Sequence, residues 1–140
     1  MIRQDATPEL LNKEYNGNMC SHIGIEYTEV GSDYICAKMP VDERTRQPIG
    51  VLHGGASVVL AESIGSLASN LCVNLEKQYC VGLSINANHV KSVKEGYVFA
   101  KAKAVHIGGT THIWNIEVKN EAGDLVCVSR LTVAVLNKKK

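Results

Sequence analysis

The chain has 140 residues, of which 45% are hydrophobic and 21% are charged, and its formal net charge at pH 7 is +1. These values are ordinary for a globular protein of modest size, so we predict one domain over residues 1–140. A charge so close to zero argues against nucleic acid as the main partner, and the run Lys138–Lys140 is typical of a solvated chain end.

The sequence also lacks the marks of export or membrane insertion. Residues 1–5 lack the apolar stretch of a signal peptide. The longest low-charge run, residues 47–75, is interrupted by proline, glycine, asparagine and Glu62, which makes a poor membrane span. The five cysteines are odd in number and show no CxxC spacing, so we expect free thiols in a cytoplasmic protein.

The first predicted elements in chain order are a short helix and two strands. Thr7 is suited to cap a helix that has Pro8 at its first position, and this helix should end near Gly17. Strands are predicted over residues 23–30 and 34–41. In the second strand, apolar and more polar residues alternate with a period of two, which is typical of a half-buried strand.

One long helix and four more strands follow a loop over residues 41–55. The segment from residue 56 to about 75 has no proline and is rich in Ala, Leu, Val and Ser, which predicts a helix roughly 30 Å long. The strands are expected at residues 81–90, 97–107, 111–119 and 125–136. This order predicts an α+β fold, with an antiparallel sheet of about six strands curled around one helix. A sheet face left uncovered favours self-association.

Glu62 is the only formally charged residue between Arg46 and Glu76. Burying an unpaired carboxylate costs several kcal/mol, so folding alone gives no reason to keep it there. Two interpretations remain open from spacing alone. Glu62 pairs with Arg130 or His89 in the core, or it is a catalytic carboxylate.

Gly54 and Gly55 lie where the loop becomes the predicted helix. The first turn of a helix has free N–H groups that stabilise negative charge on a ligand oxygen, although two glycines are also compatible with a simple tight loop. Glu62 lies seven residues, or about 10 Å, beyond Gly55 on the same helix, so one chain cannot bring both to one carbonyl carbon. A two-fold pair of subunits could form two sites, each with one helix start and one partner carboxylate.

Three nearby residues are weaker candidates, and each is also compatible with a structural role. Ser66 lies four residues after Glu62 on the same helix face and could orient the carboxylate. His53 and Gln47 in the preceding loop could position a substrate carbonyl or a water. No histidine pair has a convincing metal-ligand spacing, and no nucleophile, P-loop or GxGxxG motif occurs. We therefore predict neither a metal nor a cofactor.

The segment from Gly50 to Ser66, GVLHGGASVVLAESIGS, closely resembles the helix signature of hotdog-fold acyl-CoA thioesterases. These include the 1,4-dihydroxy-2-naphthoyl-CoA thioesterases of menaquinone biosynthesis and the proofreading thioesterases of enterobactin biosynthesis. The similarity extends through residues 39–48, 81–90 and 129–132. The resemblance implies a hotdog fold with about five to six strands around a central helix, and hydrolysis of an aromatic acyl-CoA. It also implies homodimers with shared sites, usually joined into a homotetramer.

The same resemblance implies a role for each candidate residue. Glu62 would attack the thioester carbon or activate water, the Gly55 amide would polarise the carbonyl, and His53 and Gln47 would position thioester or water. Residues expected to contact the acyl group or line the site are Ser66, His89 and Val90. Residues expected to contact CoA are Lys91, Ser92, Lys94, Gly108, Gly109 and Thr110.

The sequence departs from the family pattern at Thr110, where relatives are expected to carry a basic residue, so the nucleotide contacts stay open. Two other functions are compatible with the residues: a hotdog dehydratase or hydratase, and a non-catalytic acyl-CoA sensor. Neither of these would release free thiol from an acyl-CoA.

Overall fold

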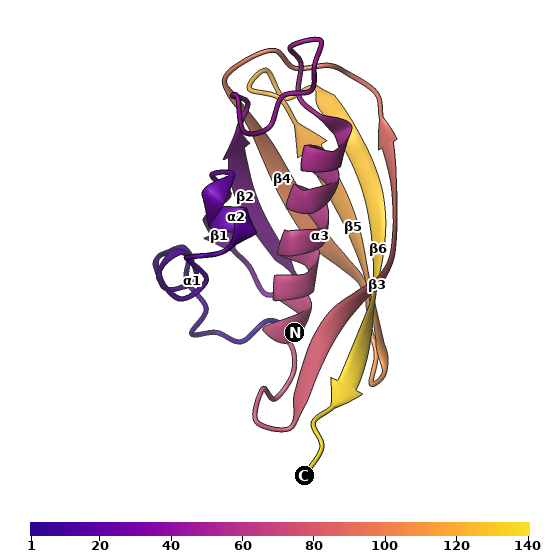
Figure 1. Cartoon of the computed structure of the whole chain (residues 1–140). Coiled ribbons are helices and arrows are strands. Elements are labelled where there is room, and N and C mark those ends of the chain that lie inside the picture. The colour runs from indigo at the N-terminus through magenta and orange to yellow at the C-terminus, as the bar shows by residue number, and fades with distance from the viewer.

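The computed structural model describes residues 1–140 as one six-stranded antiparallel sheet with a long helix against one face (Figure 1). The strand order is β1-β2-β4-β5-β6-β3, so β1 and β3 form the two edges. The helix α3 contacts β2, β3, β4, β5 and β6, which confirms the predicted α+β arrangement. The strands are β1 (Glu26–Val30), β2 (Tyr34–Pro40), β3 (Gln78–His89), β4 (Tyr97–Ile107), β5 (Thr111–Lys119) and β6 (Leu125–Asn137).

The core lies between α3 (Gly54–Asn70) and the inner face of the sheet. Alternation along β4 buries Val98, Ala100 and Ala102 and leaves the intervening residues exposed, as the period of two predicts. Gly65 allows close packing, because a Cβ there would lie only 2.6 Å from Leu131 Cδ2. Small residues on helix and sheet therefore let the two layers approach closely.

The helix α3 begins and ends earlier than predicted. It starts at Gly54 rather than residue 56, because His53 accepts a hydrogen bond from the Gly55 N–H through Nδ1 and caps the first turn. It ends at Asn70 rather than near residue 75. The Asn70 side chain bonds the carbonyl of Ser66 and both backbone groups of Cys80, which joins the end of α3 to β3.

The N-terminal region confirms one predicted cap and corrects two boundaries. Thr7 caps α1 (Pro8–Glu14), which ends before the predicted Gly17. The predicted strand over residues 23–30 begins only at Glu26. A short helix that was not predicted, α2 (Met19–His22), precedes it and is held by a capping box that Asn18 forms with its third residue.

The edge strand β3 is long and exposes apolar side chains. It begins at Gln78, earlier than predicted, because its pairing with β6 continues to Asn137. The exposed apolar residues on β3 and just after it are Tyr79, Val81, Leu83 and Val90, and Leu83 is 68% exposed. A long apolar edge is a ready template for pairing with another chain.

The run Lys138–Lys140 is exposed, but it is attached to the fold. The Lys138 N–H donates to the Lys77 carbonyl at 2.8 Å, which extends the β3–β6 end of the sheet. The run is therefore a solvated chain end, as predicted, although its first residue is bonded to the sheet. None of the helices in this chain has the length and apolar character needed to cross a membrane.

Candidate active site

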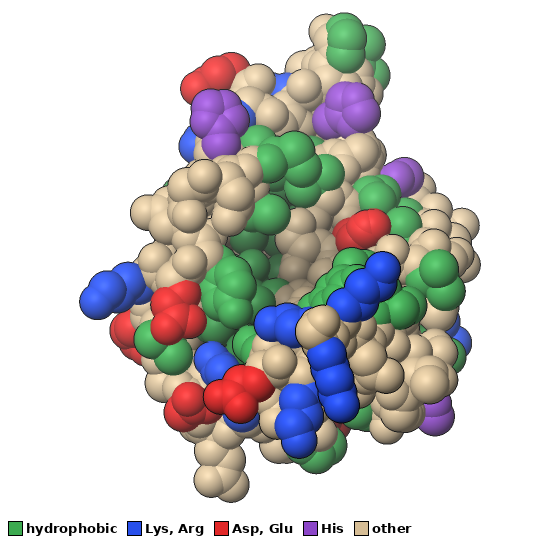
Figure 2. Space-filling view, turned by 60° about the horizontal axis from the view of Figure 1, so that its bottom comes forward, with side chains coloured by type: hydrophobic (Ala, Val, Ile, Leu, Met, Phe, Trp, Pro, Cys, Tyr) green, Lys and Arg blue, Asp and Glu red, His purple; other side chains and the backbone are tan.

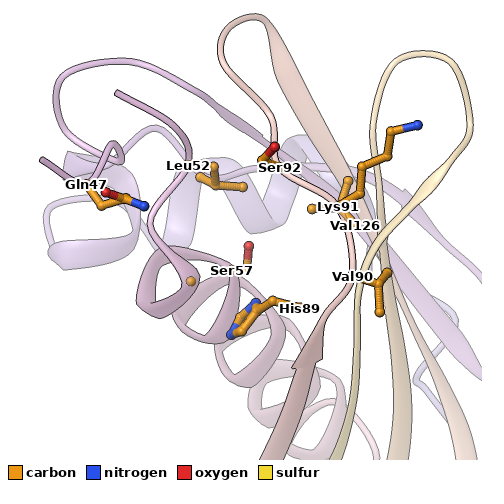
Figure 3. A pocket seen from close by; sticks show the side chains of 9 residues that line it. Gln47, Leu52, Ser57, His89, Val90, Lys91, Ser92 and Val126 are labelled. Atoms are coloured by element: carbon orange, nitrogen blue, oxygen red, sulfur yellow. The ribbon is translucent and has the colours of Figure 1, made fainter. Parts of the chain in front are cut away.

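A cavity of about 430 Å³ opens at the N-terminal end of α3 (Figure 3). It brings together five of the predicted site residues, which are Gln47, His89, Val90, Lys91 and Ser92. Its remaining lining residues are Leu52, Gly54, Ser57 and Val126. Of these, sequence reasoning missed Leu52, Ser57 and Val126 as functional candidates.

The start of α3 provides the polar floor of this cavity. His53 Nδ1 lies 2.8 Å from the Gly55 nitrogen and occupies that N–H. The neighbouring Gly54 N–H has no hydrogen-bond acceptor within the chain. The amide that was predicted to polarise a carbonyl is therefore satisfied by His53 in this state, and a ligand oxygen would have to replace the imidazole there.

Gln47 presents its amide nitrogen to the cavity. Its Oε1 accepts a hydrogen bond from the Ile49 N–H at 2.9 Å, which fixes the orientation of the side chain. The nitrogen is left free to donate, and Figure 3 shows it directed toward the cavity. Gln47 is thus positioned as a donor to an oxygen bound near the start of α3.

His89 lies directly on the backbone of Gly54. A Cβ added at Gly54 would be only 2.9 Å from His89 Nε2, so the ring depends on the missing side chain of that glycine. His89 comes from the end of β3 and Gly54 from the start of α3. This contact closes one side of the cavity between helix and edge strand.

Lys91 borders the cavity, but its charge is already paired. Its Nζ lies 2.7 Å from the Asp124 carboxylate, and this ammonium lowers the pKa of Asp124, with a further hydrogen bond from Asn120. Figure 3 shows the Lys91 ammonium pointing away from the centre of the cavity. Lys94 is exposed and does not line the cavity, although its backbone carbonyl accepts a hydrogen bond from Arg46.

Glu62 is half-buried, lies outside this cavity and faces the edge strand. A Cβ added at Gly82 of β3 would be 3.2 Å from Glu62 Cδ, so the carboxylate lies against the backbone of that glycine. No ion pair or hydrogen bond joins Glu62 to Arg130, to His89 or to Ser66. Arg130 is exposed, and the interpretation of Glu62 as one half of a buried pair is not realised in this chain.

The turn Gly108–Thr110 joins β4 to β5 at the other end of the sheet (Figure 1). The Thr110 carbonyl accepts from the Val135 N–H, near the end of β6, whereas His89 pairs with Cys127 near its beginning. One chain therefore does not bring this turn to the cavity. No three His, Cys, Asp or Glu side chains are arranged to hold a metal ion.

Residues 49–127, which include the start of α3, Glu62 and every lining residue of the cavity except Gln47, match the family model described as the thioesterase superfamily. The chain belongs to this superfamily. This thioesterase is therefore a thioester hydrolase, and the predicted family and enzyme class are confirmed.

Three relatives illustrate how closely this thioesterase matches known members. It is 52% identical over 134 residues to the 1,4-dihydroxy-2-naphthoyl-CoA hydrolase of Escherichia coli, covering 96% of this chain and 98% of that protein. It is 42% identical to the proofreading thioesterase EntH of Cronobacter turicensis, covering 96% and 97%. Its structure matches that of a mutant of thioesterase PA1618 from Pseudomonas aeruginosa with a TM-score of 0.95 and 46% identity, covering 98% and 99%. The hotdog thioesterase fold is thereby confirmed.

Proposed function

We propose that this thioesterase hydrolyses aromatic acyl-CoA thioesters to the free acid and CoA, at sites that two copies of the chain form together. The observation that carries the proposal is the position of Glu62. The carboxylate is half-buried without an ionic partner and lies against the edge strand β3. The donors at the start of α3 are about 10 Å away along the same helix.

Pairing of two copies through β3 would bring Glu62 of one copy to the donors at the start of α3 of the other. The strand pairs with β6 on one side only, and its other edge carries the exposed Val81 and Leu83. In an antiparallel pair of identical strands, the first half of one strand, which contains Gly82, lies beside the second half of the other, which ends at His89. The partner's Glu62 would then face the cavity at the start of α3. The exposed Phe99 and Val105, on the sheet face opposite α3, support further association into a tetramer.

The chemistry follows from these positions. The thioester carbonyl oxygen would accept hydrogen bonds from the Gly55 N–H, once His53 has moved, and from the Gln47 amide. The partner's Glu62 would act in one of two ways. It would attack the carbonyl carbon to give an anhydride that water then hydrolyses, or it would take a proton from an attacking water. Either route breaks the C–S bond, consumes one water and releases CoA with its thiol protonated.

The preference for an aromatic acyl group rests on the lining of the cavity and on a relative. Leu52, Val90 and Val126 supply apolar surface beside the ring of His89. The Escherichia coli relative is named for a naphthoyl-CoA substrate, which supports a role in menaquinone biosynthesis.

The five cysteines are all free, as expected for a protein of the reducing cytoplasm.

A substrate panel with a thiol-trapping reagent tests the activity. We expect wild-type protein to release thiol from benzoyl-CoA and 1,4-dihydroxy-2-naphthoyl-CoA with a higher kcat/KM than from acetyl-CoA or palmitoyl-CoA. Glu62→Ala should lose about 100- to 10,000-fold in kcat. Near wild-type turnover by Glu62→Ala would overturn the mechanism. Binding or dehydration without thiol release would favour the sensor or the dehydratase.

A heterodimer tests whether the site is shared. Glu62→Gln removes the carboxylate half, and Gly54→Val removes the other half by displacing His89. At substrate concentrations well below the wild-type KM, each variant alone should have little activity. A heterodimer isolated through two different affinity tags would contain one site with neither substitution, and it should regain about half of wild-type activity per dimer. An inactive heterodimer would show that each site lies within one chain.

A further inference from the structure

The residues expected to bind CoA do not supply enough free positive charge for its phosphates. Lys91 is paired with Asp124, so Lys94, which lies outside the cavity, is the only lysine among them without an ion pair. The turn Gly108–Thr110 carries a threonine at its last position and no basic side chain. CoA nevertheless has a diphosphate and a ribose phosphate, so a binding site for it requires cations elsewhere.

A separate cluster of lysines lies at the end of the sheet where β3 begins and β6 ends. It surrounds a cavity of about 560 Å³ that is lined by Glu76, Lys77, Asn137, Lys138, Lys139 and Lys140. We call Lys77 and Lys138–Lys140 the lysine cluster. Glu76 is the only acidic residue among the lining residues, and no lysine of the cluster forms an ion pair. Figure 2 brings this end of the molecule forward and shows Lys and Arg side chains gathered beside hydrophobic surface.

Two hydrogen bonds hold Lys138 of the cluster in place. The Lys138 N–H donates to the Lys77 carbonyl, and Lys138 Nζ donates to the Leu75 carbonyl at 2.6 Å. These bonds fix Lys138 against the segment that leads into β3. The ammonium groups of Lys77, Lys139 and Lys140 remain without acceptors and are exposed to an incoming anion.

The position of the cluster relates it to the active site of a second copy. Asn70 ends α3 eight residues, or about 12 Å, beyond Glu62, and its side chain bonds Cys80 at the start of β3. The cluster lies beyond this point. Antiparallel pairing of two β3 strands brings the Gln78 end of one copy beside the His89 end of the other. The cluster of one copy would then border the mouth of the other copy's cavity, beyond the Glu62 that serves it.

We propose that the lysine cluster binds the phosphates of a CoA thioester whose acyl group occupies the cavity of the paired copy. The inference rests on the proposed function and on its shared site. Flexible ammonium groups bind phosphate as point charges, so the interaction is strong at low ionic strength and weakens with added salt.

Two variants and two substrates test this assignment. The triple variant Lys77→Gln/Lys139→Gln/Lys140→Gln removes the free ammonium groups of the cluster. The control Arg3→Gln/Lys13→Gln removes positive charge at exposed positions of the N-terminal region, away from both cavities and from the sheet face proposed for further association. Each is assayed with benzoyl-CoA and with benzoyl-N-acetylcysteamine, which has the same thioester but no phosphate.

We expect the cluster variant to raise the KM for benzoyl-CoA about tenfold at low ionic strength, with kcat within about twofold of wild type. Its kinetics with benzoyl-N-acetylcysteamine should be unchanged, and the difference in KM should shrink in 0.5 M NaCl because the Debye length falls to only a few ångströms. The control variant should match wild type. Benzoyl-3′-dephospho-CoA identifies the phosphate concerned, because it should lose the sensitivity only if the 3′-phosphate is bound.

An unchanged KM for benzoyl-CoA in the cluster variant would overturn the inference. Equal losses on both substrates would also overturn it, because they would show that the substitutions act on the fold. A wild-type protein that releases no thiol from any CoA thioester would instead contradict the proposed function, before any variant is compared.

Discussion

The contact between α3 and β3 has a glycine at each of its two ends, but the glycine belongs to the helix at one end and to the strand at the other. At the start of α3, a glycine of the helix, Gly54, lies under His89 of the strand. Two turns along, a glycine of the strand, Gly82, lies under Glu62 of the helix. Each glycine lets one polar side chain rest against the backbone of the other element. The comparison shows how one interface positions an imidazole and a carboxylate independently, at places too far apart to act on the same atom within one chain.

The largest expected effect comes from exchanging the reactive group at each end. Glu62→Gln should lower kcat by about 100- to 10,000-fold, because the carboxylate acts on the reacting carbon or on water. Its melting temperature should equal or exceed that of wild type, because the substitution removes an unpaired, half-buried charge. His89→Gln should act mainly on KM. Steady-state kinetics and thermal denaturation measure both, and a kcat loss in His89→Gln as large as in Glu62→Gln would contradict this division of roles.

Breaking the dimer should also remove most activity, because it separates the start of α3 in one copy from Glu62 of the other copy. Leu83→Lys places a charge on the exposed edge of β3, where like charges would face each other in an antiparallel pair. We expect sedimentation to show monomers and kcat/KM to fall at least about tenfold at low protein concentration. Lys is tolerated on an exposed edge, so the fold should persist. A fully active monomer would show that the start of α3 and Glu62 do not have to come from two copies of the chain.

The glycines themselves offer a milder test. In Gly82→Ala the added Cβ would lie 3.2 Å from Glu62 Cδ and displace the carboxylate by a few tenths of an ångström, so kcat should fall about tenfold. In Gly54→Ala the Cβ would lie 2.9 Å from His89 Nε2, and KM should rise instead. In a Glu62→Gln background, Gly82→Ala should cost much less than in wild type. Additive effects in that double-mutant cycle would mean that Gly82 does not act through Glu62.

The smallest effect concerns the cap of α3. His53→Ala removes the acceptor for the Gly55 N–H and should lower the free energy of unfolding by about 1 kcal/mol. Urea denaturation measures this loss. His22→Ala, at an exposed position at the end of α2, provides the control and should stay within about 0.5 kcal/mol of wild type. Equal stability of the two variants would show that the cap contributes nothing.

Boundaries of helices and strands were predicted accurately where residues close to them in the sequence set them. The strands β4 and β5 have the predicted limits, because alternating side chains and a glycine turn between them act within a few residues. The start of α3 was misplaced, because capping by His53 depends on the orientation of one imidazole ring. The helix α2 is only 4 residues long, too short for a periodic pattern to appear.

The sequence by itself determined the fold class and the family, because local patterns and a motif shared with known thioesterases express them, and it predicted Glu62, Gln47 and His89 as site residues. Only the tertiary structure decided which residues meet. Val126 joins the cavity because its carbonyl accepts from the Val90 N–H, and Leu52 because it bonds the Val93 carbonyl. The tertiary structure also decided that Lys91 forms an ion pair with Asp124 and that the turn Gly108–Thr110 lies at the far end of the sheet. Propensity and periodicity act between near neighbours in the chain, whereas a cavity and its charge balance depend on segments that only folding brings together.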